Sequence, residues 1–238
     1  MATRPVLGDV VLLPKDANFS PDALQAIVDR FKSNRLQALQ LDPDAFGSTY
    51  ERESQFTYQT WLSRITNPLS KTFVALEHQE SSITSEDSAS RLCHLLGNNE
   101  WLGTVTVLGP KSLSGGESSL SSTPWRLFTR ENSSESPDLT SIKNRHAVYL
   151  IVGMFVSPSR RREGHGRRLV EAALTAAMEE SRGISASRVI VCLMVEPRNV
   201  AARRLYESVG FGIRGSEPAD NAVTFPTIGM TWEKELMA

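Results

Sequence analysis

Residues 161–166 carry arginines and glycines in an order that suits the binding of a phosphate ester. The segment reads RREGHG and follows an apolar run that predicts a buried strand. Gly164 and Gly166 let the backbone approach an anion closely, and the first amide groups of a helix starting here attract negative charge. Local positive charge comes from Arg160, Arg161, Arg162, Arg167 and Arg168. The alternative interpretation is a plain strand-to-helix turn whose arginines are solvated.

Two other kinds of phosphate loop are excluded by the residues around this segment. A Walker loop needs Gly-Lys-Ser/Thr, and a dinucleotide-binding fingerprint needs a third glycine where Leu169 stands. His165, which lies between the two glycines, is expected to pack or to contact phosphate rather than to act as a base.

A second group of residues lies on a short helix predicted over 199–211. Asn199, Ala202 and Tyr206 are spaced so that they share one face of that helix. Because Ala202 is small, a slender ligand can lie between Asn199 and Tyr206. Gly210 is a natural residue just beyond the helix end. The alternative is a helix that only packs on the core.

These motifs belong to an alternation of strands and helices, which predicts an α/β fold. Strands are predicted at 9–13, 72–77, 101–108, 147–156, 188–196, 211–215 and 223–233. Helices are predicted after Ser20-Pro21, where serine caps the helix and proline starts it, over 50–66, after 166 and over 199–211. The run 147–156 is apolar throughout, which is typical of a central strand covered on both faces.

Composition excludes several classes of protein. Lys and Arg total 26 against 27 Asp and Glu, a net charge of −1, which argues against a nucleic-acid binder that relies on bulk positive charge. No apolar run reaches the roughly 18 residues of a membrane span, and the amino terminus lacks the apolar core of a signal peptide. Cys93 and Cys192 make neither a disulfide framework nor a zinc site. We expect a cytoplasmic protein with no bound metal.

The segment from about 110 to 146 is rich in serine and differs from the rest of the chain. It contains SLSGGESSLSS and ENSSESPDLTS, which cannot bury enough apolar surface to order themselves. We expect a partly disordered insertion at a sheet edge within a single domain spanning 1–238, and removal of about 112–140 is expected to leave the fold intact. PWRLF at 124–128 is the exception, since it could dock onto the body.

Together the two motifs resemble the GNAT superfamily of acyl-CoA-dependent N-acetyltransferases. The family signature Gln/Arg-x-x-Gly-x-Gly/Ala is matched by Arg161, Gly164 and Gly166. The signature Asn-x-x-Ala-x-x-x-Tyr, followed by Gly-Phe, is matched by Asn199, Ala202, Tyr206, Gly210 and Phe211. The resemblance covers about 147–234, and 45–53 is similar to the acceptor-side segment of many members. It implies a mixed, mostly antiparallel sheet with splayed central strands, flanked by helices.

The resemblance also implies acetyl-CoA as cosubstrate and a position for it. Its pyrophosphate would lie on the backbone amides of 161–167, a range that includes Arg162, Glu163, His165 and Arg167. Its pantetheine arm would run between the strands at 147–156 and 188–196 and would be bound by Asn199. The thioester carbonyl would accept one hydrogen bond from a backbone N–H near Phe155 or Val156, a one-donor oxyanion hole.

Acyl transfer to an amine needs a proton donor for the departing thiolate and an acceptor for the amine proton. Tyr206 suits the first role because a phenol is protonated at neutral pH. For the second role, Met194 stands where related amino-terminal peptide acetyltransferases carry a glutamate. Glu196, two residues on, projects to the same strand face if no bulge intervenes and is the candidate base. Glu51, Glu53 and a water chain are alternatives, and Cys192 is expected to be a packing residue.

The acceptor side is predicted less closely. Its candidate residues are Phe46, Tyr50 and Glu53, with Phe56 and Trp61 as further possible walls. We expect an N-acetyltransferase that acts by direct attack of a primary amine, as a monomer or homodimer, without nucleic-acid or membrane partners. The absence of glutamate at Met194 favours a small-molecule amine slightly over a peptide or protein amine. The alternatives are a catalytically silent acyl-CoA-binding sensor or scaffold, and a nucleotide-binding regulator.

Overall fold

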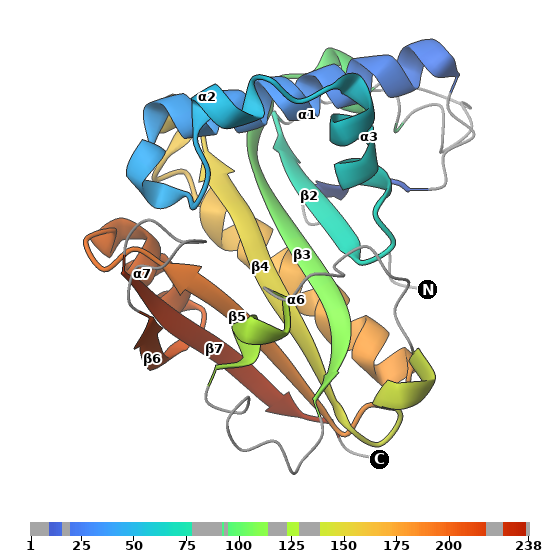
Figure 1. The fold of residues 1–238 in the computed structure, drawn as a ribbon, viewed down its shortest axis with the longest axis vertical. Coiled ribbons are helices and arrows are strands. Elements are labelled where there is room, and N and C mark those ends of the chain that lie inside the picture. The colour runs from blue at the N-terminus through green and yellow to red at the C-terminus, as the bar shows by residue number, and fades with distance from the viewer. Residues whose placement is uncertain are drawn as a thin grey trace.

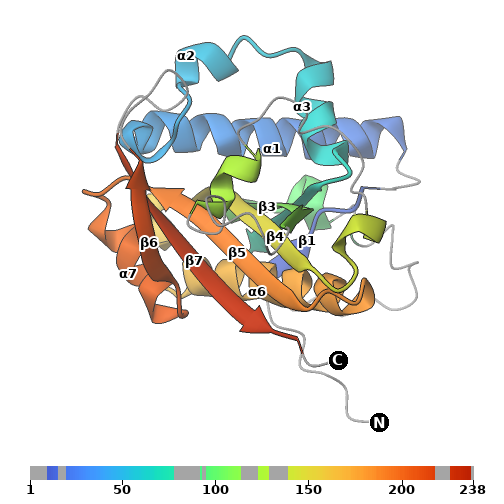
Figure 2. The same cartoon turned by 60° about the horizontal axis from the view of Figure 1, so that its bottom comes forward.

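The fold is a single seven-stranded sheet with helices on both faces, as Figures 1 and 2 show. The computed structural model describes residues 10–15, 20–77, 92, 95–113, 123–128, 139–217 and 226–236. Within these ranges the strands are β1 (Val10–Leu12), β2 (Ser70–Leu76), β3 (Trp101–Leu113), β4 (His146–Val156), β5 (Arg188–Val195), β6 (Gly212–Glu217) and β7 (Thr227–Glu235). Their order across the sheet is β1-β2-β3-β4-β5-β7-β6.

Strand direction in this sheet is mixed but mostly antiparallel. Only the central pair, β4 and β5, is parallel. A parallel pair needs a crossover connection, and the helix α6 (His165–Gly183) supplies it. The mixed, mostly antiparallel sheet flanked by helices is therefore confirmed.

The remaining helices divide between the two faces of the sheet. The helices α1 (Pro21–Leu41), α2 (Tyr50–Glu53) and α3 (Tyr58–Thr66) lie over one face, and α6 lies against the other (Figure 2). The helix α7 (Val200–Ser208) follows β5. Short 3-10 turns are η1 (Pro43–Ala45), η2 (Pro124–Phe128), η3 (Leu139–Ile142) and η4 (Pro158–Arg160). In the part of the chain that the structure describes, no helix is long and apolar enough to cross a bilayer.

One predicted helix is divided in the structure. The sequence predicts a continuous helix over 50–66, whereas α2 ends at Glu53 and α3 begins at Tyr58. Two threonines explain the break: the Thr49 hydroxyl accepts a hydrogen bond from the Arg52 amide, and the Thr57 hydroxyl accepts one from Thr60. Each threonine is an N-cap, so each begins its own helix.

The two central strands diverge towards their carboxyl ends. The pairing of β4 with β5 covers only 146–150 against 188–192. Beyond that point β4 continues along β3 and β5 continues along β7. Gly153, which has a positive φ of 62°, lies where the β3–β4 register shifts and forms a bulge. The splayed central strands are thus confirmed, and the opening lies beside the bulged part of β4.

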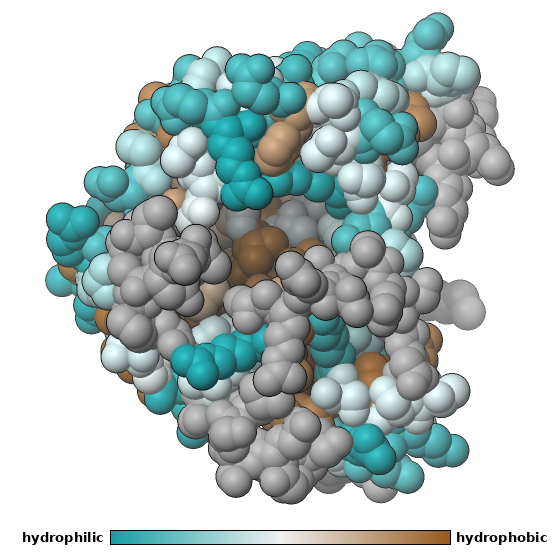
Figure 3. Space-filling model, in the orientation of Figure 1, coloured by the Kyte–Doolittle hydropathy of each residue, from teal (hydrophilic) through white to brown (hydrophobic). Residues whose placement is uncertain are grey.

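The face of the sheet under α1 and α3 is hollowed at its centre. Figure 3 shows hydrophobic side chains at the bottom of this hollow and polar side chains of the helices along its upper edge. The apolar core on the opposite face is larger and includes residues of α6 and α7 packed on β3, β4 and β5.

Part of the serine-rich segment belongs to the core. Trp125 of η2 is 1% exposed and packs on Gly229 of β7 so closely that a Cβ there would lie 1.9 Å from the indole ring. Lys111 donates a hydrogen bond to the Leu127 carbonyl at 2.8 Å. The docking of PWRLF is confirmed, and the expectation that 112–140 can be removed harmlessly is wrong, because its removal would uncover this core. Residues 114–122 and 129–138, where partial disorder is predicted, lie outside the described residues.

Candidate active site

The loop between β4 and α6 presents unpaired backbone amides at a helix N-terminus. Gly164 is the N-cap of α6, with φ of 86° and no side chain bonded to the helix end. The first backbone hydrogen bond of the helix runs from the Arg168 amide to the Gly164 carbonyl at 3.1 Å. The amides of His165, Gly166 and Arg167 precede that bond and lack intrahelical acceptors. Their dipoles and the open N-cap favour a bound anion.

The two glycines of the loop have different roles. A Cβ on Gly166 would lie 3.1 Å from Leu205 of α7 and 3.3 Å from Met154 of β4. Glycine at 166 therefore lets the start of α6 lie close to both neighbours. A Cβ on Gly164 would meet no atom within 4 Å, so this position opens to free space, and its positive φ of 86° favours glycine.

Arg161 connects three parts of the site. Its Nε donates to the Val156 carbonyl at the end of β4, at 3.0 Å. Its terminal nitrogen forms an ion pair with Asp42, which directly follows α1. The guanidinium group therefore ties the loop between β4 and α6 to the end of β4 and to the connection between α1 and η1.

The other arginines form less of a positive cluster than the sequence predicts. Arg160 is ion-paired with Glu77, and Arg167 with Glu171 at 2.7 Å. Each of these carboxylates offsets one positive charge. Arg162 forms no hydrogen bond or ion pair with any residue that the structure describes, and it has a positive φ of 74°.

Both ring nitrogens of His165 have hydrogen-bond partners at the start of α6. It is 6% exposed, and its Nδ1 lies 2.8 Å from a terminal nitrogen of Arg168. Because a guanidinium group can only donate, Nδ1 accepts and the ring proton is on Nε2. That nitrogen lies 3.2 Å from a carboxylate oxygen of Glu163 and donates to it. His165 thus offers a ligand its backbone amide and no free ring nitrogen.

One backbone N–H of β4 points into the opening between the central strands. The Ser157 amide donates to the Leu102 carbonyl of β3 at 2.8 Å. Successive residues of a strand direct their backbone groups to opposite sides, so the N–H of Val156 points away from β3, towards the side that β5 has left. The backbone N–H of Phe155 points towards β3, where this residue is paired with Thr104. Of the two residues that the sequence proposes as oxyanion donors, Val156 has the required direction.

The residues of the second motif extend from the N-cap of the helix α7 to the positions just beyond its end. Asn199 is its N-cap, and the side-chain oxygen accepts from the Ala202 amide at 3.0 Å, which leaves the side-chain nitrogen available. The Tyr206 ring packs edge-on against Phe211, with centroids 5.6 Å apart. The Tyr206 hydroxyl forms no hydrogen bond within the described part of the chain. Burial raises the pKa of Tyr206 above its usual value, so the phenol is protonated at neutral pH.

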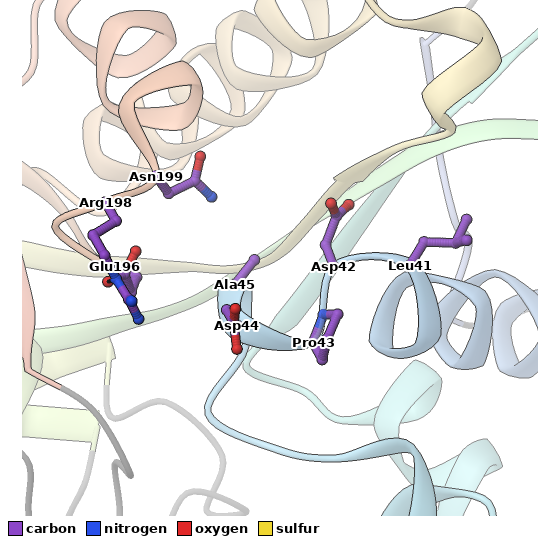
Figure 4. A pocket seen from close by; sticks show the side chains of 8 residues that line it. All are labelled: Leu41, Asp42, Pro43, Asp44, Ala45, Glu196, Arg198 and Asn199. Atoms are coloured by element: carbon purple, nitrogen blue, oxygen red, sulfur yellow. Dashed lines mark hydrogen bonds and ion pairs between the residues drawn. The ribbon is translucent and has the colours of Figure 1, made fainter.

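Glu196 lies in a cavity between the end of α1 and the start of α7. The cavity has a volume of about 430 Å³ and is lined by Leu41, Asp42, Pro43, Asp44, Ala45, Glu196, Arg198 and Asn199, as Figure 4 shows. The Glu196 side chain is 7% exposed and accepts a hydrogen bond from Arg198 Nε at 2.8 Å. This carboxylate and the Asn199 side chain therefore line the same cavity.

Glu53 differs from its predicted role on the acceptor side. It is 1% exposed and forms ion pairs with Arg35 at 2.8 Å and Arg64 at 2.7 Å. Although burial alone opposes ionisation, these two arginines lower the pKa of Glu53 to about 2. The carboxylate is occupied by the arginines and offers nothing to an amine. The Phe46 ring lies under the Arg35 guanidinium, at 4.7 Å. Phe46 lines neither the cavity that contains Glu196 nor the cavity between α1, α3, β3 and β4.

Tyr50 is the first residue of α2, and it lines neither the Glu196 cavity nor the cavity between α1, α3, β3 and β4. Glu51, the alternative base, is exposed on the same short helix. Cys192 is fully buried in β5, and burial raises the pKa of its thiol, which agrees with a packing role.

Replacing Glu53 by glutamine is expected to lower the free energy of unfolding by about 3 kcal/mol, because two partly buried guanidinium groups would lose the buried carboxylate that balances their charge. Denaturation with urea at pH 7 measures this loss. Glu51→Gln is the matched control, since that exposed side chain is expected to change stability by less than about 0.5 kcal/mol. Equal stability of the Glu53 variant and the wild type would contradict the structural role.

The pH dependence of the same variant gives a second measurement. The folded-state pKa of about 2 lies below the value of about 4.3 for an unfolded glutamate. The ion pairs therefore stabilise the protein above pH ~4.5, and this contribution is lost as the pH falls towards 2. The difference in stability between wild type and variant should narrow over that range.

Comparisons with known proteins agree on one fold. A model of the Acetyltransferase (GNAT) family matches residues 35–211. NAA60 from Arabidopsis thaliana in complex with a bisubstrate analogue is 16% identical, with a TM-score of 0.52 over 95% of this chain and 99% of that chain. The same plant protein in complex with acetyl-CoA is 17% identical, with a TM-score of 0.50 over 94% and 98% of the two chains. A search of curated proteins finds no significant match.

Proposed function

Because the chain belongs to the acetyltransferase (GNAT) family and is an acetyl-CoA-dependent acetyltransferase, we propose that it acetylates a primary amine of a small molecule by direct attack. The observation that carries this proposal is the position of one loop. The uncapped N-terminus of α6 lies directly after the part of β4 that has separated from β5. A phosphate site and an open strand edge therefore adjoin, as a long phosphorylated thioester requires.

The residues of the site fit acetyl-CoA in three places. The free amides at 165–167 suit its phosphates, and open space beside Gly164 leaves room for them. The opening between β4 and β5 suits the extended arm. The side-chain nitrogen of Asn199 is available to that arm, since only its oxygen is used in capping α7.

Acetyl-CoA supplies the acetyl group as a thioester, and the protein supplies hydrogen bonds and proton acceptors around it. The Val156 N–H donates to the carbonyl oxygen as the amine attacks the carbonyl carbon and the carbon–sulfur bond breaks. Glu196 accepts the amine proton, directly or through one water molecule in its cavity. Tyr206 donates to the departing sulfur. Its raised pKa makes it a weaker acid than a thiol of about 8.5, so Tyr206 acts mainly by donating a hydrogen bond.

A small-molecule acceptor is favoured over a peptide or protein amine on two grounds. Met194 stands where related amino-terminal peptide acetyltransferases carry a glutamate, so the amine proton must leave by another route. The two cavities described for this chain are about 430 and 400 Å³, a size that suits a small ligand.

The experiment that tests the function is thiol release from acetyl-CoA across a panel of primary amines. The panel contains small amines of different charge and short peptides with free amino termini. We expect release with at least one small amine, at a higher kcat/KM than with any peptide. Tight binding of acetyl-CoA without release to any acceptor would instead support the silent sensor or scaffold.

Replacing Glu196 by glutamine is expected to lower turnover about tenfold at pH 7, below the usual range for a buried base because water can enter the cavity. The loss should shrink as the pH approaches ~10, where an alkylamine loses its proton unaided. Exposed Glu51→Gln serves as the control, and acetyl-CoA affinity should be unchanged in both. A pH profile identical to that of the wild type would show that the proton leaves through water alone.

A further inference from the structure

A second cavity lies on the hollowed face of the sheet, between α1, α3 and the strands β3 and β4. Its volume is about 400 Å³. Six of its lining residues matter here: Asn34, Arg35, Arg64, Thr104, Val152 and Gly153. The cavity lies on the face that Figure 3 shows as hollowed, where hydrophobic side chains form the bottom and polar ones the upper edge.

The position of this cavity connects it to the proposed reaction site. Gly153, at one wall, is the bulge residue in the part of β4 that has left β5. Val156, whose N–H is the proposed oxyanion donor, lies three residues further along the same strand, or roughly 10 Å at about 3.3 Å per residue. A small acceptor held in the cavity can therefore extend its amine to the opening.

The opposite wall carries an excess of positive charge. Arg35 and Arg64 share one carboxylate, that of Glu53, so the three side chains together carry a net charge of +1. Arg35 uses Nε and one terminal nitrogen on Glu53, and Arg64 uses one terminal nitrogen. The remaining guanidinium donors have no other acceptor among the described residues. No acidic side chain is among the described residues that line this cavity.

The two arginines are held in place before any ligand binds. The Arg35 guanidinium lies over the Phe46 ring at 4.7 Å, and that of Arg64 lies over Phe56 at 4.8 Å and over Trp61 at 5.1 Å. Their side chains are 18% and 36% exposed. Guanidinium groups fixed in this way lose little freedom when they bind a planar anion with two parallel hydrogen bonds.

Three neutral polar side chains of the cavity, those of Asn34, Thr104 and Thr106, are already paired. Asn34 donates to the Trp101 carbonyl at 3.4 Å and accepts from the Thr104 hydroxyl at 3.0 Å. Thr72 and Thr106 are bonded to each other at 2.8 Å. Arg35 and Arg64 are the charged side chains among the described lining residues, and both retain donors for a ligand.

We propose that the acceptor is a small primary amine that carries a carboxylate, and that Arg35 and Arg64 bind this carboxylate. The inference rests on the proposed function and deepens it by naming the class of acceptor. Glu53 then acts as a positioning residue that holds both guanidinium groups at the wall. An acceptor with a second positive charge in place of the carboxylate would be repelled by the same wall.

The test compares amino acids with their carboxamides, which match them in length and lack the negative charge. For the chain length that reacts best, we expect the wild type to prefer the carboxylate in kcat/KM by about tenfold to a hundredfold, the effect of one or two hydrogen bonds to a charged group. Arg64→Gln should remove most of this preference, chiefly through KM, and Arg64→Lys should retain part of it. The preference is the ratio of two kcat/KM values measured on the same variant. A lower fraction of folded protein reduces both values equally and therefore leaves the ratio unchanged.

Arg52→Gln is the matched control, since it removes the same charge from an exposed neighbour of Glu53 that does not line the cavity. It should keep the wild-type preference. A wild type that acetylates amines but treats carboxylates and carboxamides alike would overturn this inference and leave the proposed function standing. A preference that survives Arg64→Gln would overturn the assignment to this cavity.

A binding measurement covers the case in which no amine reacts, which would refute the proposed function. Calorimetry with N-acetylated amino acids, which retain the carboxylate, needs no turnover. We expect binding to the wild type, at least tenfold weaker binding to Arg64→Gln, and unchanged binding to Arg52→Gln. Absence of binding to the wild type, or equal binding to Arg64→Gln, would overturn the carboxylate site by itself.

Discussion

Gly164→Asp is expected to weaken acetyl-CoA binding at least ~100-fold while the protein remains folded. The φ of 86° is one that aspartate adopts more readily than most residues, and the Cβ meets open space. At the N-cap, the new carboxylate would accept from the free amides of α6 and place a negative charge where a phosphate binds. The loss of two hydrogen bonds to a charged group costs about 3–6 kcal/mol of binding free energy, which corresponds to an affinity at least ~100-fold weaker.

Isothermal calorimetry measures this loss, and circular dichroism checks folding. Gly164→Asn is the matched control, because asparagine has the same shape and backbone tolerance without the charge. The difference in affinity between the two variants isolates the electrostatic part. Wild-type affinity in a folded Gly164→Asp protein would show that acetyl-CoA phosphates bind elsewhere.

Tyr206→Phe is expected to lower turnover about 100-fold, the lower end of the range for the loss of one preorganised hydrogen-bond donor to a developing negative charge. Only the hydroxyl is removed, so the ring contact with Phe211 is preserved. The hydrogen bond to the departing sulfur matters only as charge develops there. The loss should therefore appear equally in kcat and in kcat/KM. A thiolate leaves fairly easily by itself, which is why a larger loss is not expected.

Two controls define this result. Acetyl-CoA affinity of Tyr206→Phe should match that of the wild type, since the hydroxyl bonds to no described residue. Tyr58→Phe removes an exposed hydroxyl at the start of α3 and should leave turnover unchanged. Full turnover by Tyr206→Phe on the best acceptor would make Tyr206 a packing residue and leave the thiolate without a protein donor.

Local patterns in the sequence are sufficient for most of the sheet and for the position of the loop between β4 and α6. The strand β4 is a continuous apolar run and α6 has a regular apolar stripe, so both are predicted close to their observed bounds. The break between α2 and α3 was missed, although Thr57 is a capping residue. The capping preference of Thr57 is a local signal for the start of a helix. The apolar spacing that continues across the break favours one continuous helix instead.

The contacts between distant residues were beyond the reach of such patterns. Glu53 is 18 residues from Arg35 and 11 from Arg64, and Arg161 is 119 residues from Asp42. Each contact depends on how helices pack over the sheet, and a charged residue on a short helix is usually solvated. Glu53 was therefore expected to face an amine, and the arginine wall of the second cavity was not foreseen.

The place of the loop at 157–164, where we propose that acetyl-CoA phosphates bind, within the crossover from β4 to β5 has a consequence for the lifetime of the protein. The loop exists only when the central parallel pair has formed, so the unfolded chain has no equivalent site. Acetyl-CoA at a hundred times its dissociation constant would then add about 2.7 kcal/mol to the free energy of unfolding by mass action. Transient opening, and the proteolysis that follows it, would become about a hundredfold rarer. Abundance of the protein would thus follow the supply of its own cosubstrate.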